Sequence, residues 1–141
     1  MEIFFLEKTN ITSSIEKQIQ DLFSELSDIQ TVSLEKLFGL TQSPYIALCT
    51  DENKIVGMAT MAVYDVISGR KAWIEDVVVS SNYRQKGIGE RLTQFLIEKA
   101  KELEVSVLLL YSNPKREAAH RLYKRMGFLE KGSTLFSMTI K

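Results

Sequence analysis

The stretch that decides the fold runs from Val77 to Gly89 and reads VVVSSNYRQKGIG. It begins with a β-branched run typical of a strand, passes through a short polar turn, and reaches Gly87 where an amphipathic helix begins. The N–H groups of a helix's first turn have no partner within the helix, and the helix dipole adds roughly half a positive charge there. Glycines let the backbone approach a phosphate closely, and Arg84 and Lys86 add mobile positive charge. The pattern therefore predicts a site for a ligand that carries a pyrophosphate.

Size and composition indicate one soluble globular domain. The 141 residues, 45% hydrophobic and 26% charged, are enough for a single core, and we expect one domain over residues 1–141. The lone Cys49 excludes a disulfide within the chain, and no apolar run approaches the roughly 20 residues of a membrane span. The N-terminal MEIFFLEKTN lacks the basic start and apolar core of a signal peptide. These features predict a cytoplasmic protein that does not bind membranes.

The charges are distributed unevenly, although the net charge is zero. Residues 1–52 hold nine acidic and three basic side chains, and residues 53–141 hold nine acidic and fifteen basic ones. The basic part includes the expected phosphate site, as an anionic ligand would favour, but solvated helix faces explain the distribution equally well. Nucleic-acid binding is disfavoured because no basic strip is interleaved with aromatic residues.

Hydrophobic periodicity predicts an α/β domain with a strand–helix–strand–helix core and antiparallel strands on either side. Strands are expected over residues 2–8, 45–50, 55–67, 71–79, 105–111, 128–130 and 134–140. Helices are expected from near Ser13, from Thr31 or Ser33 to Gly39, from Gly87 to Leu103, and from Asn113 as a cap to Gly127. Residues 105–111 are almost continuously apolar, which favours a central strand covered on both faces.

Two motifs together resemble one known family. Arg84-x-x-Gly87-x-Gly89 after a β-branched strand resembles the acyl-CoA pyrophosphate motif of the GNAT superfamily of N-acyltransferases. The segment EAAHRLY over residues 117–123, followed by MGF over residues 126–128, resembles that family's last helix and the start of its next strand. The resemblance covers essentially the whole chain. It implies a mixed, mostly antiparallel sheet that splays in a V between its two central parallel strands and is flanked by about four helices.

The resemblance also implies acetyl-CoA as the acyl-donor cosubstrate. It places the backbone amides from Gln85 to Glu90 on the pyrophosphate, and it pairs the backbone of the valine run with the pantetheine arm, where a free N–H could polarise the thioester carbonyl. Many members carry an Asn at the position of Arg116, whereas here Asn113 lies one helical turn earlier. Asn113 could touch the pantetheine or only cap the helix. The expected cofactor-binding residues are Val77, Val78, Val79, Arg84, Gln85, Lys86, Gly87, Ile88, Gly89, Glu90, Asn113 and Arg116.

Two residues are candidates for the acid–base chemistry. By resemblance, Tyr123 is the general acid that protonates the departing thiolate; its phenol, with a reference pKa of about 10, is protonated at neutral pH, and packing alone is the alternative. The attacking amine must lose a proton to a base, directly or through water. Glu75 shares parity along its strand with Val77 and Val79, and a glutamate here is a recurrent base candidate in the family, so we choose it. Asp76 is the second candidate, and a structural carboxylate is the alternative role.

Other reactive residues receive structural assignments. His120, the only histidine, is expected on a helix surface or in a capping role, and Cys49 is expected to be buried. No cluster of His, Cys and Asp has metal-ligand spacing, so no metal site is predicted.

The predicted function is transfer of an acetyl group from acetyl-CoA to a primary amine by direct attack in a ternary complex. The alternative is a non-catalytic acyl-CoA-binding regulatory module. The acceptor, a small cationic amine or a protein amine, is left open, and the protein is expected to be a monomer or homodimer.

Overall fold

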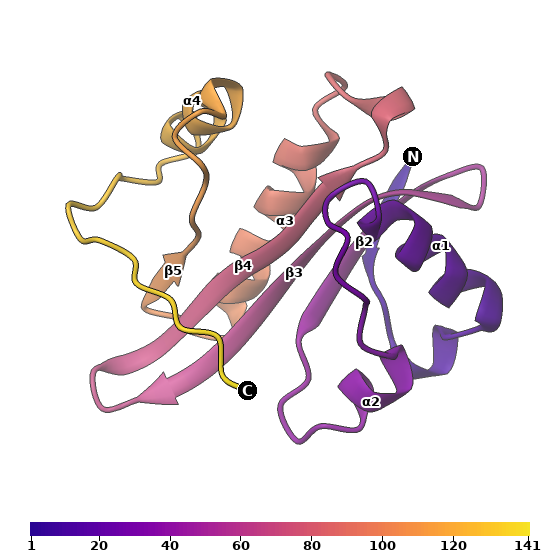
Figure 1. The fold of residues 1–141 in the computed structure, drawn as a ribbon, viewed down its shortest axis with the longest axis horizontal. Coiled ribbons are helices and arrows are strands. Elements are labelled where there is room, and N and C mark those ends of the chain that lie inside the picture. Colours follow the sequence, from indigo (N-terminus) through magenta and orange to yellow (C-terminus); the bar gives the residue numbers. More distant parts are fainter. The chain divides into compact units, whose positions relative to one another are not determined.

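The structure, a computed structural model, describes residues 1–141 and forms two compact units, residues 1–110 and residues 111–141 (Figure 1). The strands are β1 (Glu2–Phe5), β2 (Tyr45–Asp51), β3 (Lys54–Val66), β4 (Gly69–Val79) and β5 (Val107–Leu109). The helices are α1 (Ser13–Phe23), α2 (Leu34–Phe38), α3 (Ile88–Glu102) and α4 (Glu117–Arg125), with 3-10 turns η1 (Lys8–Asn10) and η2 (Ser81–Tyr83). None of these helices combines the length and apolar character that crossing a membrane requires.

The five strands form one mixed sheet in the order β1-β2-β3-β4-β5. The first three pairings are antiparallel, and only β4 and β5 are parallel. That parallel ladder joins Lys71, Ala72 and Trp73 to residues 107–109 and then stops. The expected mixed, mostly antiparallel sheet that opens between its two parallel strands is therefore confirmed.

Helices cover both faces of the sheet, and neighbouring residues of β3 show which helix lies where. Met58 belongs to the buried cluster that includes Leu22 of α1 and Leu34 of α2. Gly57 points the other way, because a Cβ on it would come within 3.0 Å of Ile88 and 3.1 Å of Leu92 in α3. Successive residues of a strand face opposite sides, so α1 and α2 pack on one face and α3 on the other (Figure 1).

Side-chain caps start the first two helices. The Thr12 hydroxyl accepts a hydrogen bond from the N–H of Ile15 at 3.1 Å, so Thr12 is the cap of α1. The Glu16 carboxylate, in the first turn of α1, accepts from the N–H of Leu34 at 2.8 Å. Glu16 thereby joins the start of α2 to α1. The helix near Ser13 and the end of α2 at Gly39 are confirmed.

The start of β5 is fixed by contacts with the start of β4. The N–H and the hydroxyl of Ser106 both donate to the carbonyl of Arg70, at 2.8 and 2.9 Å. The Arg70 guanidinium in turn donates to the carbonyl of Leu103 and pairs with Asp65. These contacts hold the chain that leaves α3 against β4 and set the register of the short parallel ladder.

Some predicted elements are wrong in extent. The strand predicted over residues 105–111 is only three residues long, and Val107 is 40% exposed, so it is not a central strand covered on both faces. The strands predicted over residues 128–130 and 134–140 are absent. Phe128 is half-buried, and the other large apolar side chains there are exposed: Leu129, Leu135, Phe136, Met138 and Ile140. Alternation along a sequence supplies side chains for two faces but not a partner for the ladder, and no ladder pairs with these segments.

Candidate functional site

The loop from β4 to α3 forms a concave backbone turn at the helix start. Gln85 and Gly87 adopt left-handed conformations, with φ of 63° and 78°, and Gly87 is the residue before α3. No side chain caps this helix, whose first N–H groups have no acceptor within it. Consecutive backbone N–H groups in such a turn make an anion-binding concavity. We call residues 84–90 the cradle.

The two glycines of the cradle differ in what surrounds them. A Cβ on Gly87 would meet no atom within 4 Å, so the space beside it is open. A Cβ on Gly89 would meet only a methyl of Val79, at 3.9 Å, which is ordinary contact. Packing inside the protein therefore does not require glycine at Gly89, whereas the positive φ favours it at Gly87. The open backbone surface is what an approaching phosphate needs.

The two cations of the cradle are held by neighbouring groups. The Nε of Arg84 donates to the carbonyl of Val79 at 3.2 Å, and the ammonium of Lys86 lies 5.1 Å from the centre of the Tyr83 ring. The Tyr83 hydroxyl donates to Asp51 at 3.0 Å, and this hydrogen bond is the main cause of its raised pKa. Asp51 thus holds Tyr83 in place, and the Tyr83 ring contacts the ammonium of Lys86.

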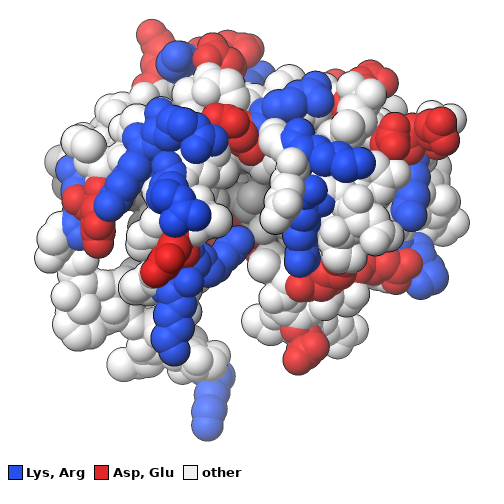
Figure 2. Space-filling view, turned by 90° about the horizontal axis from the view of Figure 1, so that it is seen from above, with Lys and Arg blue, Asp and Glu red and all other residues white.

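Local groups have to supply the attraction for an anion. Lys and Arg (blue) and Asp and Glu (red) both occur over the face drawn in Figure 2, and the net charge is zero. The positive end of α3 together with Arg84 and Lys86 supplies such a local attraction.

A β-bulge interrupts β4 immediately before the valine run. Thr60 pairs with Glu75 and Met58 pairs with Val78, so β4 has one more residue than β3 over this interval. Asp76 has a φ of 52°, and the Thr60 hydroxyl donates to the carbonyl of Glu75 at 3.0 Å. A bulge of this kind bends its strand and redirects side chains.

The bulge changes which face of the sheet Glu75 occupies relative to Val79. Because Thr60 and Met58 lie two residues apart, their partners Glu75 and Val78 share the face covered by α1 and α2. Val79 pairs with Gly57 and faces α3. The expectation that Glu75 faces the same side as Val79 is therefore wrong, because the extra residue shifts the alternation by one.

Two adjacent carboxyls occupy the bulge, and the pKa of each is raised. Although both residues keep solvent contact, burial raises the pKa of Glu75, and the neighbouring Asp76 raises it further. Burial also raises the pKa of Asp76, while the Thr60 hydroxyl, 3.4 Å away, opposes that shift. A carboxylate whose pKa moves toward neutrality is a stronger base.

Beyond Trp73, β4 keeps a strand partner on one side only. The antiparallel ladder with β3 continues to Val79, whereas the parallel ladder with β5 ends at Trp73. The backbone groups of residues 74–79 on the β5 side are therefore available to an extended ligand. This open edge is followed in the chain by η2 and then by the cradle.

The second unit contains the remaining candidates. The Tyr123 ring makes an edge contact with Phe128, with centroids 5.8 Å apart, and the Tyr123 carbonyl accepts from the Phe128 N–H at 2.9 Å. Burial raises the pKa of Tyr123 above its usual value, against the charge of Arg116. The phenol therefore stays protonated at neutral pH and is able to donate a proton.

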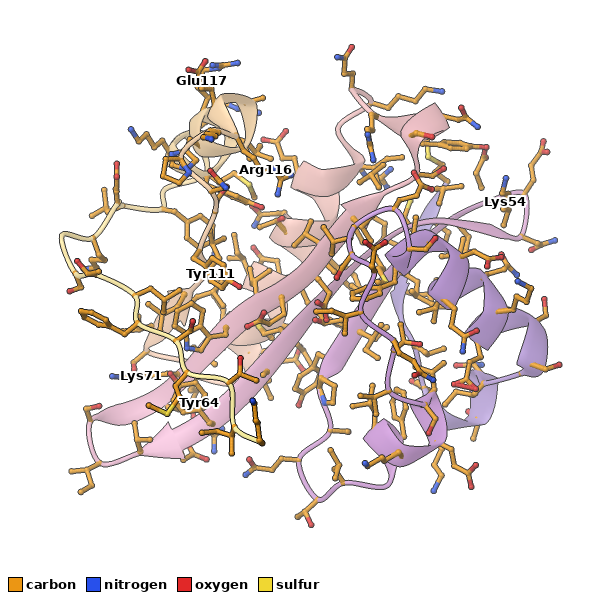
Figure 3. The ribbon with its side chains drawn as sticks, viewed as in Figure 1. Lys54, Tyr64, Lys71, Tyr111, Arg116 and Glu117 are labelled. Atoms are coloured by element: carbon orange, nitrogen blue, oxygen red, sulfur yellow. The ribbon has the colours of Figure 1, made fainter.

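Asn113 does not cap α4. Its side chain accepts from the N–H of Lys115 at 2.9 Å, in a local turn, and Arg116 is the residue that precedes the helix. Figure 3 shows Arg116 and Glu117 at this helix start. His120 lies 3.3 Å from the carbonyl of Ser112, a local structural contact.

The match to a protein family decides the classification. The model of the GNAT acetyltransferase family matches residues 12–128. The chain belongs to the GNAT family of acetyltransferases. The matched range includes β4, the cradle and Tyr123.

Solved structures share the fold at low sequence identity. An aminoglycoside acetyltransferase from an uncultured soil metagenomic sample, in complex with trehalose, is 23% identical with a TM-score of 0.84, over 99% of this chain and 96% of its own. Glucosamine-6-phosphate N-acetyltransferase from Arabidopsis thaliana is 21% identical with a TM-score of 0.80, over 99% and 98%. A protein described as a transcriptional regulator from Bacillus halodurans C-125 is 20% identical with a TM-score of 0.75, over 99% of each chain. These similarities show the GNAT fold.

A separate cavity of about 580 Å³ opens elsewhere on the first unit of this GNAT protein. Its lining includes Phe5, Tyr45 and Lys99, and no residue of the cradle or the bulge. The cavity is therefore distinct from the candidate site.

Several residues that shape the site could not be identified from the sequence. Glu25, Asp51, Thr60 and Tyr83 act through hydrogen bonds to or within the loop and the bulge. Their partners are up to 56 residues away, and no local pattern marks such pairs. Cys49 is fully buried as predicted, and burial raises the pKa of its thiol.

We expect Gly87→Ala to weaken acetyl-CoA binding at least about tenfold, because the new methyl would occupy the open space of the cradle. It should also cost about 1–2 kcal/mol of stability through the left-handed φ. Gly127→Ala is the matched control, since Gly127 also has a positive φ and a Cβ on it would likewise meet no atom within 4 Å, but it follows α4 and lies outside the cradle. Calorimetric titration should then show weakened binding only for Gly87→Ala; equal affinity in both variants would contradict the cradle assignment.

We expect Asp76→Asn to raise the melting temperature at pH 7. A raised folded-state pKa means that the ionised carboxyl is disfavoured in the folded protein, so stability is lost as pH rises from the ordinary value through the raised one. Asn removes this cost and tolerates the positive φ; with solvent screening the gain is under about 1 kcal/mol, or about 1–3 °C. The gain should vanish as pH falls toward 4 in thermal melts.

Asp65→Asn is the control for that pH series. Its hydrogen bond from Arg70 lowers the pKa of the Asp65 carboxyl, so its replacement should not stabilise the protein at pH 7. A pH-independent gain for Asp76→Asn would show that charge burial is not the cause.

Proposed function

We propose that this GNAT protein is an acetyl-CoA-dependent N-acetyltransferase that moves an acetyl group to a primary amine by direct attack in a ternary complex. One observation carries the proposal: a strand edge that lacks a partner beyond Trp73 leads into an uncapped helix start with an open backbone at Gly87. An extended amide-bearing arm followed by a pyrophosphate, as in coenzyme A, matches this order of groups.

The donor is bound mainly by backbone groups in this proposal. The N–H groups from Gln85 to Glu90 contact the pyrophosphate, with Arg84 and Lys86 beside them. The free edge of the valine run pairs with the pantetheine amides as an added strand would. Asn113 and Arg116 remain the candidates for a further contact with the pantetheine.

The chemistry needs one proton removed and one supplied. Acetyl-CoA supplies an acetyl thioester; transfer forms an amide C–N bond and breaks the thioester C–S bond. Glu75 takes the proton from the amine, directly or through water, and its raised pKa favours this role. Asp76 is the second candidate for the base. Tyr123, protonated at neutral pH, gives a proton to the departing sulfur.

The acceptor is proposed only as a class. The excess of acidic side chains over residues 1–52 favours a cationic amine, small or on a protein. The solved relatives are named for aminoglycosides and for glucosamine 6-phosphate, which are both amines. A fold shared at such low identity does not carry the acceptor over to this chain.

A second candidate function is a non-catalytic acyl-CoA-binding regulatory module. The similar structure described as a transcriptional regulator favours it. Such a module would keep the cradle and would not need Glu75 and Tyr123. Their raised pKa values favour the enzyme.

The experiment that separates the two functions is an acceptor-panel assay. Purified protein is mixed with acetyl-CoA and a set of polyamines, aminoglycosides, amino sugars and lysine peptides, and thiol release is followed. Amine-dependent release with a matching acetylated product supports the enzyme. Binding of acetyl-CoA without release supports the module, and absence of acetyl-CoA binding by calorimetry contradicts both.

We expect Tyr123→Phe to lower kcat by about 10²–10⁴, the usual contribution of one acid–base group. Phenylalanine retains the ring that contacts Phe128, so the melting temperature and the Kd for acetyl-CoA should stay near the wild-type values. Turnover within a factor of about three of wild type would contradict the assignment of Tyr123 as the general acid.

A further inference from the structure

The turn that follows α1 reaches the loop that leads into the cradle. Glu25 lies two residues beyond the end of α1, and its carboxylate accepts a hydrogen bond from the N–H of Ser81 at 3.0 Å. The same oxygen lies 3.7 Å from the guanidinium of Arg84. One side chain from a distant segment therefore contacts both ends of η2.

The hydrogen bond from Ser81 to Glu25 supplies an acceptor that η2 otherwise lacks at its start. Ser81 is the first residue of η2, and the preceding Ser80 provides no side-chain cap. The first N–H groups of a helical turn need an external acceptor, and an ionised acceptor makes a stronger bond than a neutral one. The Glu25 side chain is only 33% exposed, so water competes less for this bond than at an open surface.

The contact with Arg84 leaves that side chain able to bind an anion. The Nε of Arg84 donates to the carbonyl of Val79, and one terminal nitrogen faces Glu25. Arg carries five N–H donors in a planar fork, so donors remain on the other terminal nitrogen. At 3.7 Å and with Arg84 57% exposed, the ion pair is weak. Orientation of the loop is therefore the larger effect of Glu25.

We propose that Glu25 is a positioning residue for the donor cradle, which fixes the start of η2 and thereby the placement of Arg84 and the following backbone. The proposal rests on the proposed function, since it assigns Glu25 to the binding of the pyrophosphate end of acetyl-CoA. Glu25 acts through Ser81 and Arg84 and does not itself touch the donor.

Two substitutions at this position separate orientation from charge. Glu25→Gln keeps an oxygen acceptor for the Ser81 N–H and removes the charge, whereas Glu25→Ala removes both. We expect Glu25→Ala to raise the Kd for acetyl-CoA about tenfold, the size expected for loss of one charge-assisted hydrogen bond, and Glu25→Gln to stay within about twofold of wild type. If Glu25 were only a nearby negative charge, both variants would bind the anionic donor more tightly, which would overturn the proposal.

A truncated donor distinguishes positioning from general damage to the fold. S-acetyl-pantetheine lacks the pyrophosphate, so kcat/KM with it should be equal for wild type and Glu25→Ala, while kcat/KM with acetyl-CoA falls. Equal losses with both donors would point to a merely structural role and overturn the proposal. Glu98→Ala is the matched control, because Glu98 also pairs with a single cation, Lys101, at 3.4 Å on the surface of α3, and it should change neither value.

Amide hydrogen exchange reports on the loop without any donor. The Ser81 N–H should exchange faster in Glu25→Ala than in wild type, with Glu25→Gln close to wild type; unchanged exchange in Glu25→Ala would overturn the proposal. If wild-type protein failed to bind acetyl-CoA, the proposed function would fail and the role of Glu25 with it. Equal binding of acetyl-CoA by wild type and Glu25→Ala would contradict the role of Glu25 and leave the proposed function standing.

Discussion

The proposed donor site depends on one strand, β4, whose backbone is paired along its whole length on one side and only partly on the other. Backbone N–H and C=O groups away from water need partners, and β4 finds them along β3 throughout but along β5 only as far as Trp73. An extended ligand with its own amides is able to complete the ladder. Because only Ser80 and η2 separate β4 from the cradle, one short stretch of chain would contact both the arm and the phosphates of the proposed donor.

Hydrogen bonds within the protein hold η2 and the first residue of the cradle in place. Arg84 is tied to Val79, Tyr83 to Asp51, and Ser81 to Glu25. Ordering a loop on binding costs free energy that is subtracted from affinity, and a loop ordered beforehand avoids that cost. In a buried helix start, uncapped N–H groups and a left-handed glycine would lower the stability of the protein. Here they form the open surface that the cradle needs.

Features set by local chemistry could be predicted from the sequence, and features set by pairing could not. The glycine turn, the start of α1 near Ser13 and the amphipathic α3 follow from residues within a few positions of one another. The bulge at Asp76 does not, because an inserted residue appears only when β4 is aligned with β3. Parity counted along β4 alone therefore assigned Glu75 to the wrong face.

The difference between local and long-range determinants also explains the outcome for residues 134–140 and for the acids Glu25 and Asp51. Residues 134–140 alternate as a strand does, but they pair with no strand in the structure. Glu25 and Asp51 are ordinary surface acids in the sequence, and only the fold brings them to Ser81 and Tyr83. Family resemblance supplied the proposed roles of Tyr123 and the cradle because those positions lie in short motifs.

Donor and acceptor recognition differ in how strongly a short motif constrains them. In the proposed function the donor is recognised through backbone groups, and this recognition would depend on turn geometry that a few residues such as Gly87 determine. Acceptor recognition depends on side chains spread over a pocket, and structures with TM-scores of 0.84 and 0.80 to this chain are named for two different amines. A shared fold is therefore compatible with different acceptors. The role that we propose for Glu25, which lies in the turn after α1 and faces Arg84, belongs to the donor side of that division.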